Sequence, residues 1–124
     1  MNVVDSSGWL EYFADGPNAS FFAPAVEAIA ELVVPSISIY EVFKRVHQQK
    51  GEDDALRAVT IMMQALIVDL DTSLALGAAK ISIDLKLPMA DSIILATARA
   101  FEATLWTQDD HFKGIADVEY VAKK

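Results

Sequence analysis

Residues 88–106, PMADSIILATARAFEATLW, join a helix pattern to a strand pattern with almost no connection between them. Pro88 suits the first turn of a helix, which we expect to run to about Phe101. Residues 103–106 then form a short apolar run, as strands that are covered on both faces do. A helix that leads directly into such a strand is typical of α/β folds with a parallel sheet.

The same alternation of strand and helix patterns extends through the rest of the chain. Further short strands are predicted at residues 2–4, 32–35, 65–70 and 118–121. Helices are predicted from Ser6-Ser7, which offer cap chemistry, to Phe13, from a Ser20 cap to about Ala30, and at 36–50, 52–64, 72–86 and, briefly, 109–113. We therefore expect a single α/β domain over residues 1–124.

The composition is that of a compact globular protein. Hydrophobic residues make up 53% of the 124 residues, and glycine and proline are few. A chain of this length can bury one core without disulfides. The sequence contains no cysteine, which excludes a disulfide framework and a thiolate zinc site.

The net charge of −8 limits the possible partners, because an acidic surface repels a polyanion such as RNA. A nucleic-acid role therefore needs bound cations in an acidic cleft, or a groove that gathers basic side chains. The candidates for such a groove are Lys44, Arg45, Lys50 and Arg57. The N-terminal residues lack the basic region of a signal peptide, and no apolar run approaches the roughly 18 residues of a membrane span. We expect no membrane association and a cytoplasmic location.

Several carboxylates fall where open parallel sheets bind ligands, outside the carboxyl ends of the strands. Asp5 directly follows the first predicted strand, and Asp109 and Asp110 follow the strand at 103–106. Asp91 lies early in the helix after Pro88, in phase with the face that should pack inward. A carboxylate on an inward face is costly unless it is paired or bound to a metal.

Each carboxylate also has an ordinary structural explanation. Asp5 and Asp109 could cap a helix or turn, and Asp91 could be a first-turn acid favoured by the helix dipole. Their joint placement favours a site. Clustered carboxylates without cysteine suit Mg²⁺ or Mn²⁺, which commonly serve phosphate chemistry. Phosphate ester hydrolysis is the reaction class that this pattern indicates.

Four segments, taken in order, resemble the PIN-domain family, and most closely the small VapC-type toxins of bacterial toxin–antitoxin pairs. They are VVDSS at 3–7, SISIYE at 36–41, ADSIILATA at 90–98 and LWTQDDHF at 105–112. The resemblance covers nearly the whole chain in length, order and spacing. It implies a PIN-like three-layer α/β/α sandwich with a short parallel sheet of four to five strands.

The resemblance also implies an activity and a set of site residues. The implied activity is that of an endoribonuclease that depends on Mg²⁺ or Mn²⁺ and leaves a 5′-phosphate and a 3′-hydroxyl. The acidic quartet of the family maps onto Asp5, Glu41, Asp91 and Asp109, and its hydroxyl positions map onto Ser6 and Thr107. An RNA substrate, a cognate antitoxin that reaches the active site and a homodimer are implied in the same way.

Two positions cannot be derived from the pattern of the residues. Glu41 points nearly opposite to the apolar stripe of its helix and has Lys44 three residues later, so without the resemblance it is interpreted as a surface glutamate. Many relatives have Thr-x-Asp-x-Asp-Phe in the last motif, but here His111 takes the second Asp position and Asp110 precedes it. His111 could contact the phosphate or a metal-bound water, or could be an ordinary surface histidine.

Two other functions are compatible with parts of the pattern. A PIN-like module could bind protein or RNA without cutting it, although the intact quartet argues against this. A phosphatase or phosphotransfer domain could use the aspartate after the first strand, but VVDSSGW lacks the second aspartate of a DxD pattern. The preferred hypothesis is a metal-dependent endoribonuclease that acts as the toxin of a type II toxin–antitoxin pair.

Overall fold

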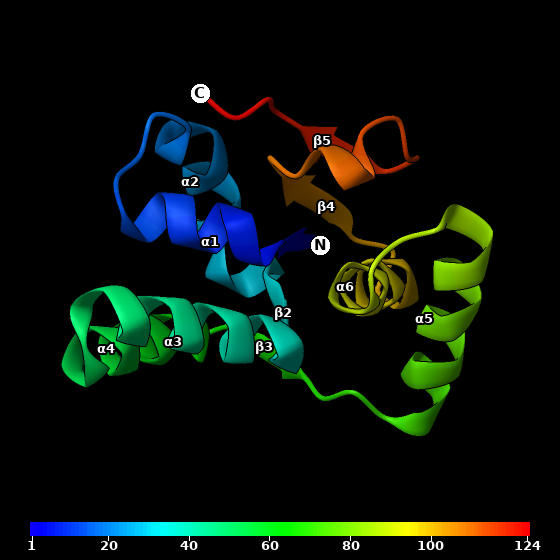
Figure 1. The fold of residues 1–124 in the computed structure, drawn as a ribbon, viewed down its shortest axis with the longest axis horizontal. Helices are drawn as coiled ribbons and strands as arrows, with labels where there is room; N and C mark the ends of the chain where they lie inside the picture. Colours follow the sequence, from blue (N-terminus) through cyan, green and yellow to red (C-terminus); the bar gives the residue numbers. More distant parts are fainter.

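The computed structural model describes residues 1–124 and shows helices on both sides of a small parallel sheet (Figure 1). The strands are β1 (Asn2–Val4), β2 (Val33–Pro35), β3 (Leu66–Val68), β4 (Thr104–Thr107) and β5 (Val118–Tyr120). The helices are α1 (Ser6–Phe13), α2 (Ala19–Glu27), α3 (Ser36–Lys50), α4 (Glu52–Met62), α5 (Thr72–Leu85) and α6 (Met89–Ala100). Two short 3₁₀ turns, η1 (Ile29–Glu31) and η2 (Asp110–Phe112), complete the chain. The predicted alternation of strands and helices is confirmed.

The strands run in the order β3-β2-β1-β4-β5 across the molecule. Hydrogen bonds define a three-stranded sheet, β1-β4-β5, and a two-stranded sheet, β2-β3. A parallel bridge between Asn2 and Leu32 joins the two. Every strand pair is parallel. All five carboxyl ends therefore lie at one edge, with β1 in the middle.

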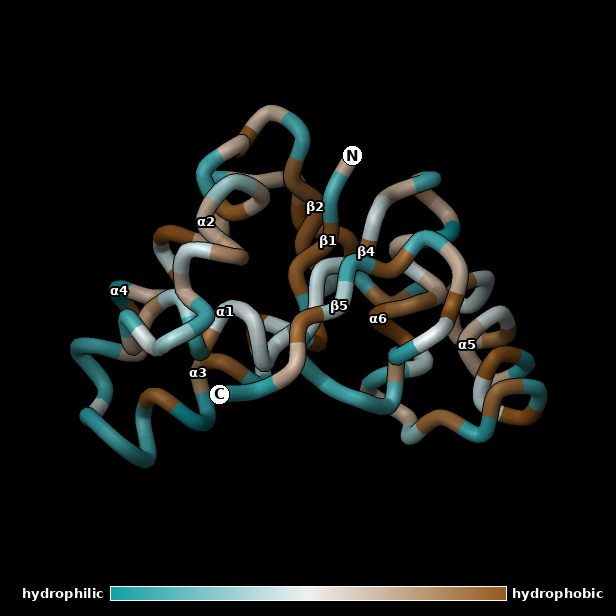
Figure 2. Tube along the Cα trace, turned by 90° about the horizontal axis from the view of Figure 1, so that it is seen from above, coloured by the Kyte–Doolittle hydropathy of each residue, from teal (hydrophilic) through white to brown (hydrophobic).

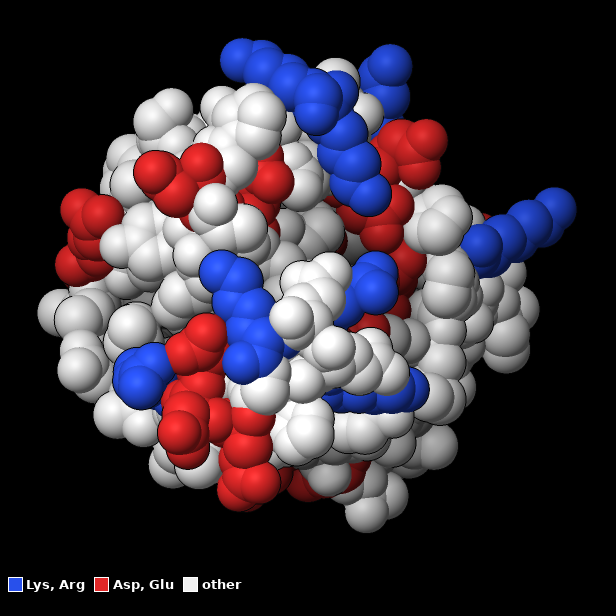
Figure 3. Space-filling model, turned by 60° about the vertical axis from the view of Figure 1, so that its left-hand side comes forward, with Lys and Arg blue, Asp and Glu red and all other residues white.

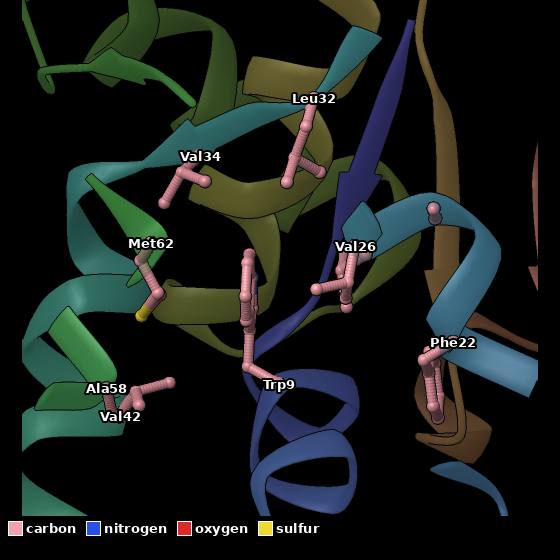
Figure 4. Close-up of a cluster of buried hydrophobic side chains, with 10 residues drawn as sticks. Trp9, Phe22, Val26, Leu32, Val34, Val42, Ala58 and Met62 are labelled. Carbon is pink, nitrogen blue, oxygen red and sulfur yellow. The ribbon is translucent and has the colours of Figure 1, made fainter. Parts of the chain in front are cut away.

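Successive residues of the central strands enter different hydrophobic clusters, because side chains of a strand alternate between its faces. Val4 and Val34 belong to a cluster around the buried Trp9, and each of the helices α1 to α4 contributes residues to this cluster (Figure 4). Val3 and Val33 belong to a second cluster on the other face, built with the buried residues of α6. Hydrophobic residues accordingly concentrate in β1, β2 and α6, at the centre of the trace (Figure 2). This two-sided packing makes the three layers that the resemblance implies.

Gly8 lets the first turn of α1 approach β1 and α2 closely. A Cβ at this position would lie 2.6 Å from Cε1 of Phe22 and 2.7 Å from Cγ1 of Val4. Both neighbours are fully buried in a close-packed core and have little room to move aside. The missing side chain thus allows α1 to start directly at the end of β1.

Three predicted helix boundaries were wrong. The cap of α1 is Asp5, because its side chain accepts a hydrogen bond from the backbone of Gly8, and Ser6 and Ser7 lie inside the helix. Ser20 does not cap α2, which begins one residue earlier, after Asn18. The prediction also extended α2 to Ala30, whereas the helix ends at Glu27 and the chain tightens into η1. Local polarity could not reveal that Asn18 is drawn into a buried tertiary contact.

Two further details differ from the sequence pattern. The helix predicted at 109–113 is only the 3₁₀ turn η2, capped by Asp109. The helix predicted at 72–86 is α5, and its apolar residues are only partly covered, because Leu85 is 40% exposed while Ala78 is buried. No helix of the chain combines the length and apolar character needed to cross a membrane.

Candidate metal centre

Asp5 lies at the carboxyl end of β1, where the chain passes directly into α1. The residue is only 3% exposed. One carboxylate oxygen accepts hydrogen bonds from the Ser7 hydroxyl at 2.6 Å and the Gly8 backbone N–H at 3.0 Å. The other accepts a hydrogen bond from the Thr107 hydroxyl at 2.7 Å. Asp5 is therefore both the helix cap that one explanation expected and a buried carboxylate fixed by three donors.

Thr107 connects Asp5 to Asp109. It ends β4 beside β1 and is fully buried. Its hydroxyl oxygen donates to Asp5 and accepts a hydrogen bond from the backbone N–H of Asp109 at 2.9 Å. Asp109 in turn caps η2 by accepting from the backbone N–H of His111 at 3.0 Å. The end of β4 thus sets the position of Asp109 relative to Asp5.

Glu41 faces this group of residues, so its interpretation as a surface glutamate paired with Lys44 was wrong. Its carboxylate accepts a hydrogen bond of 2.6 Å from the hydroxyl of Ser6, a residue that is itself buried. No ion pair joins Glu41 to Lys44; the Lys44 ammonium lies instead over the ring of Tyr40, 5.7 Å from its centroid. The side of α3 that turns away from its apolar stripe borders the ends of β1 and β4.

Asp91 comes from the first turn of α6 and meets the same carboxylates. Its side chain is 16% exposed and lies 2.9 Å from Nδ1 of His111. The same nitrogen lies 3.3 Å from a carboxylate oxygen of Asp109. One side-chain ligand atom from each of these three residues falls within 4.8 Å of the others. Four segments that are distant in sequence therefore meet at one edge of the sheet.

The carboxylates of the site lie close enough together to raise one another's pKa values. Burial, with a smaller contribution from the nearby Asp109, raises the pKa of Asp5 to about 6 against the opposing effect of its hydrogen bonds. Burial also raises the pKa of Asp91, with added repulsion from Asp109 and Glu41 and a lowering contact with His111. No Lys or Arg side chain forms an ion pair with any of the four acids.

The donor set suits a divalent cation. The four carboxylates offer hard oxygen ligands, which Mg²⁺ and Mn²⁺ prefer. Because like charges held together at low exposure are unfavourable, a bound cation would relieve the repulsion that raises these pKa values. The residues present therefore fit the ion that the sequence pattern indicates.

Other polar residues hold the group in place, and sequence reasoning missed them. The buried side chain of Asn18 donates to Oε1 of Gln108 at 2.9 Å and to the backbone carbonyl of Ala122 at 3.0 Å. Gln108 donates to the backbone carbonyl of Ser7 at 3.4 Å. The position of Gln108 between Thr107 and Asp109 was the only signal available. Asp110, by contrast, is exposed and takes part in no side-chain hydrogen bond.

The match to a known family covers nearly the same span as the fold. The family model of the PIN domain matches residues 3–118. The chain belongs to the PIN-domain family. The match includes all four carboxylate segments of this PIN domain, and the resemblance inferred from those segments is confirmed. No curated protein sequence matches the chain.

Solved structures show the same fold at low sequence identity. This PIN domain is similar to a chain of a toxin–antitoxin complex from Klebsiella pneumoniae, with a TM-score of 0.82 and 21% identity over 96% of both chains. It is also similar to VapC20 of Mycobacterium tuberculosis, a toxin that cleaves the sarcin–ricin loop, with a TM-score of 0.77 and 14% identity over 94% of this chain and 95% of the other. A third is VapBC2 from Rickettsia felis bound to promoter DNA, with a TM-score of 0.74 and 17% identity over 96% of this chain and 97% of the other.

Proposed function

We propose that this PIN domain is a metal-dependent endoribonuclease and the toxin of a type II toxin–antitoxin pair that acts in the cytoplasm. The observation that carries the proposal is the meeting of Asp5, Glu41, Asp91 and Asp109 at one edge of the sheet without a Lys or Arg partner. Support for RNA as the substrate comes from the similar fold of VapC20, a toxin that cleaves the sarcin–ricin loop.

The four carboxylates would hold one or two Mg²⁺ or Mn²⁺ ions. When bound, such an ion lowers the pKa of a water and neutralises charge on the phosphodiester. The hydrogen bonds from the Thr107 hydroxyl and the α1 backbone hold the Asp5 carboxylate in place, where it would bind the ion. Ser6 orients Glu41 from the other side. Cleavage by water would leave a 5′-phosphate and a 3′-hydroxyl.

The outer side of α3 offers a place for the RNA backbone. A hollow next to Glu41 is lined by Tyr40, Lys44, Arg45 and Gln48. The space-filling view shows Lys and Arg side chains beside Asp and Glu side chains on this side of the molecule (Figure 3). Basic groups at the rim would attract phosphates that the net charge of −8 repels.

Glu41→Gln tests the proposed function at the one acid of the four that the residue pattern alone predicted to be a surface glutamate. We expect RNA cleavage to fall about 10-fold or more, because the variant keeps the shape and the Ser6 contact but loses one negative charge at the metal. The measurement is the initial rate on a labelled RNA with added Mn²⁺. EDTA should abolish cleavage by the wild type, and excess Mn²⁺ should restore it.

A matched control for this test is Glu27→Gln, which changes a glutamate that only bonds the Tyr12 hydroxyl. Its rate should equal that of the wild type. If EDTA leaves cleavage unchanged, the metal-dependent reaction is wrong. Mn²⁺ binding with no cleavage of any RNA would favour the non-catalytic binding module.

We also propose that the antitoxin binds an apolar groove between α1, α3 and α4. The groove, of about 200 Å³, is lined by apolar residues that include Leu10, Phe13 and Ile61, and by Lys50 and the ion pair of Asp54 with Arg57. An apolar groove beside the charge of Lys50 suits an amphipathic helix that carries an acidic side chain at its edge. Antitoxin complexes among the similar structures support a protein partner.

Ile61→Arg tests the groove. Ile61 is 44% exposed in the free chain, so the fold should tolerate the change. An arginine that the bound antitoxin would bury should weaken antitoxin binding at least about 100-fold. Calorimetry with the product of the neighbouring gene measures this. Leu70→Arg, at a residue 45% exposed between β3 and α5, is the control and should bind the antitoxin normally.

A homodimer is a further proposal. Leu76 and Ile83 expose 69% and 76% of their surface on α5, and Met89 exposes 73% at the start of α6. An exposed apolar group of this kind favours an interface between two copies. The mass in solution, measured by light scattering, tests it.

A further inference from the structure

His111 is the one side chain of the candidate metal centre that is not an oxygen donor to a hard cation. Its Nδ1 lies 2.9 Å from Oδ2 of Asp91 and 3.3 Å from Oδ1 of Asp109. Ligand atoms that share an ion at about 2.1 Å are themselves about 3 to 4 Å apart. The three side chains are thus spaced as the ligands of a single ion would be.

The backbone fixes His111 at this position. Its N–H donates to Asp109, and the next residue, Phe112, is fully buried in the cluster below α6. The 3₁₀ turn η2 is therefore anchored on both sides of the histidine. The imidazole itself is 54% exposed, so it can rotate to face an ion without disturbing the core.

Neither Asp110 nor a basic side chain takes the place of His111 beside Asp91 and Asp109. Asp110 precedes it but is exposed and forms no side-chain hydrogen bond with the cluster. No Lys or Arg reaches Asp91 or Asp109. A nitrogen donor consequently stands between two carboxylates.

We infer that His111 is a nitrogen ligand of the metal ion and that it makes this site select Mn²⁺ over Mg²⁺. The inference rests on the proposed function, since it concerns the same ion. Imidazole binds Mn²⁺ and later first-row metals, whereas Mg²⁺ strongly prefers oxygen ligands and keeps its waters. An imidazole in the ligand set therefore disfavours Mg²⁺ more than Mn²⁺.

The test uses Mn²⁺ as the probe and reads its ligands directly. Pulsed electron paramagnetic resonance of the Mn²⁺-loaded full chain should show coupling to an imidazole ¹⁴N nucleus. The chain has only two histidines, which allows a matched pair of variants. The coupling should vanish in His111→Ala and persist in His47→Ala, because His47 is exposed on α3 and packs against Phe43.

Calorimetry of the same proteins measures the selectivity. His111→Ala should weaken Mn²⁺ binding about 10- to 100-fold and change Mg²⁺ binding by less than about threefold. His111→Asp should restore an all-oxygen site and bind Mg²⁺ more tightly than the wild type. Wild-type Mn²⁺ binding without ¹⁴N coupling, or coupling that survives in His111→Ala, would overturn the role of His111 and leave the proposed nuclease intact. A wild type that binds no Mn²⁺ would instead contradict the proposed function and the inference together.

Discussion

Replacing Asp5 with asparagine should lower RNA cleavage by at least about 100-fold and leave the chain folded. Asp5 is the most buried of the four carboxylates, and three donors hold it at the end of the central strand. Loss of partners outside the ligand shell already costs metal sites about 10- to 100-fold, so loss of a ligand charge should cost more. The measurement is the rate of RNA cleavage with saturating Mn²⁺, together with Mn²⁺ affinity by calorimetry.

Asp110→Asn is the matched control, because it removes the same charge from an exposed residue in the same part of the chain. It should cleave RNA within about twofold of the wild type, as expected for a surface charge screened by solvent. Unchanged cleavage by Asp5→Asn, in a preparation free of contaminating nucleases, would show that the carboxylate cluster is not the active site.

The same substitution should stabilise the metal-free protein at neutral and alkaline pH. Burial raises the pKa of Asp5 from 3.8 to about 6 in the folded protein. The folded state therefore holds the proton more tightly than the unfolded state. Stability is unaffected by this group below pH 3.8, falls as pH rises toward 6 and stays reduced above it. At pH 8 the ionised, buried carboxylate should cost between about 1 and 3 kcal/mol of folding free energy.

Asp5→Asn removes that cost. In EDTA at pH 8, urea unfolding should give a free energy of unfolding about 1 to 3 kcal/mol above the wild type, and near pH 4 the difference should disappear. Saturating Mn²⁺ should reverse the order, because only the wild type binds the ion tightly. If the variant is less stable at pH 8 as well as at pH 4, the hydrogen bonds of the carboxylate outweigh its burial.

The sequence pattern was sufficient to predict a site residue where the same local pattern of residues also specifies a strand or helix. Asp5 and Asp109 come directly after buried strands, and parallel strands bring their carboxyl ends to one edge, so their proximity could be predicted from the alternation of strands and helices. Asp91 could be found because it interrupts the inward face of a helix. Each of these positions breaks a regular pattern of apolar residues.

Glu41 breaks no such pattern. It lies on the polar side of α3, and nothing within that helix distinguishes it from a surface glutamate. Its contact with Ser6 joins residues 35 positions apart. The error at the start of α2 has the same origin, since the Asn18 side chain bonds Gln108 across 90 positions and makes no cap hydrogen bond to α2.

The sequence by itself determined the parallel α/β architecture, the family and three of the four carboxylate positions. These depend on the periodicity of apolar residues and on the residue types directly after each strand, and both are local properties of the chain. Only the tertiary structure decided that Glu41 faces the other acids, that Asp5 is both cap and buried carboxylate, and that His111 stands between Asp91 and Asp109. Those outcomes depend on how α3, α6 and the end of β4 pack around β1. Such packing is set by the shapes of two separate cores, and no short stretch of sequence contains that information.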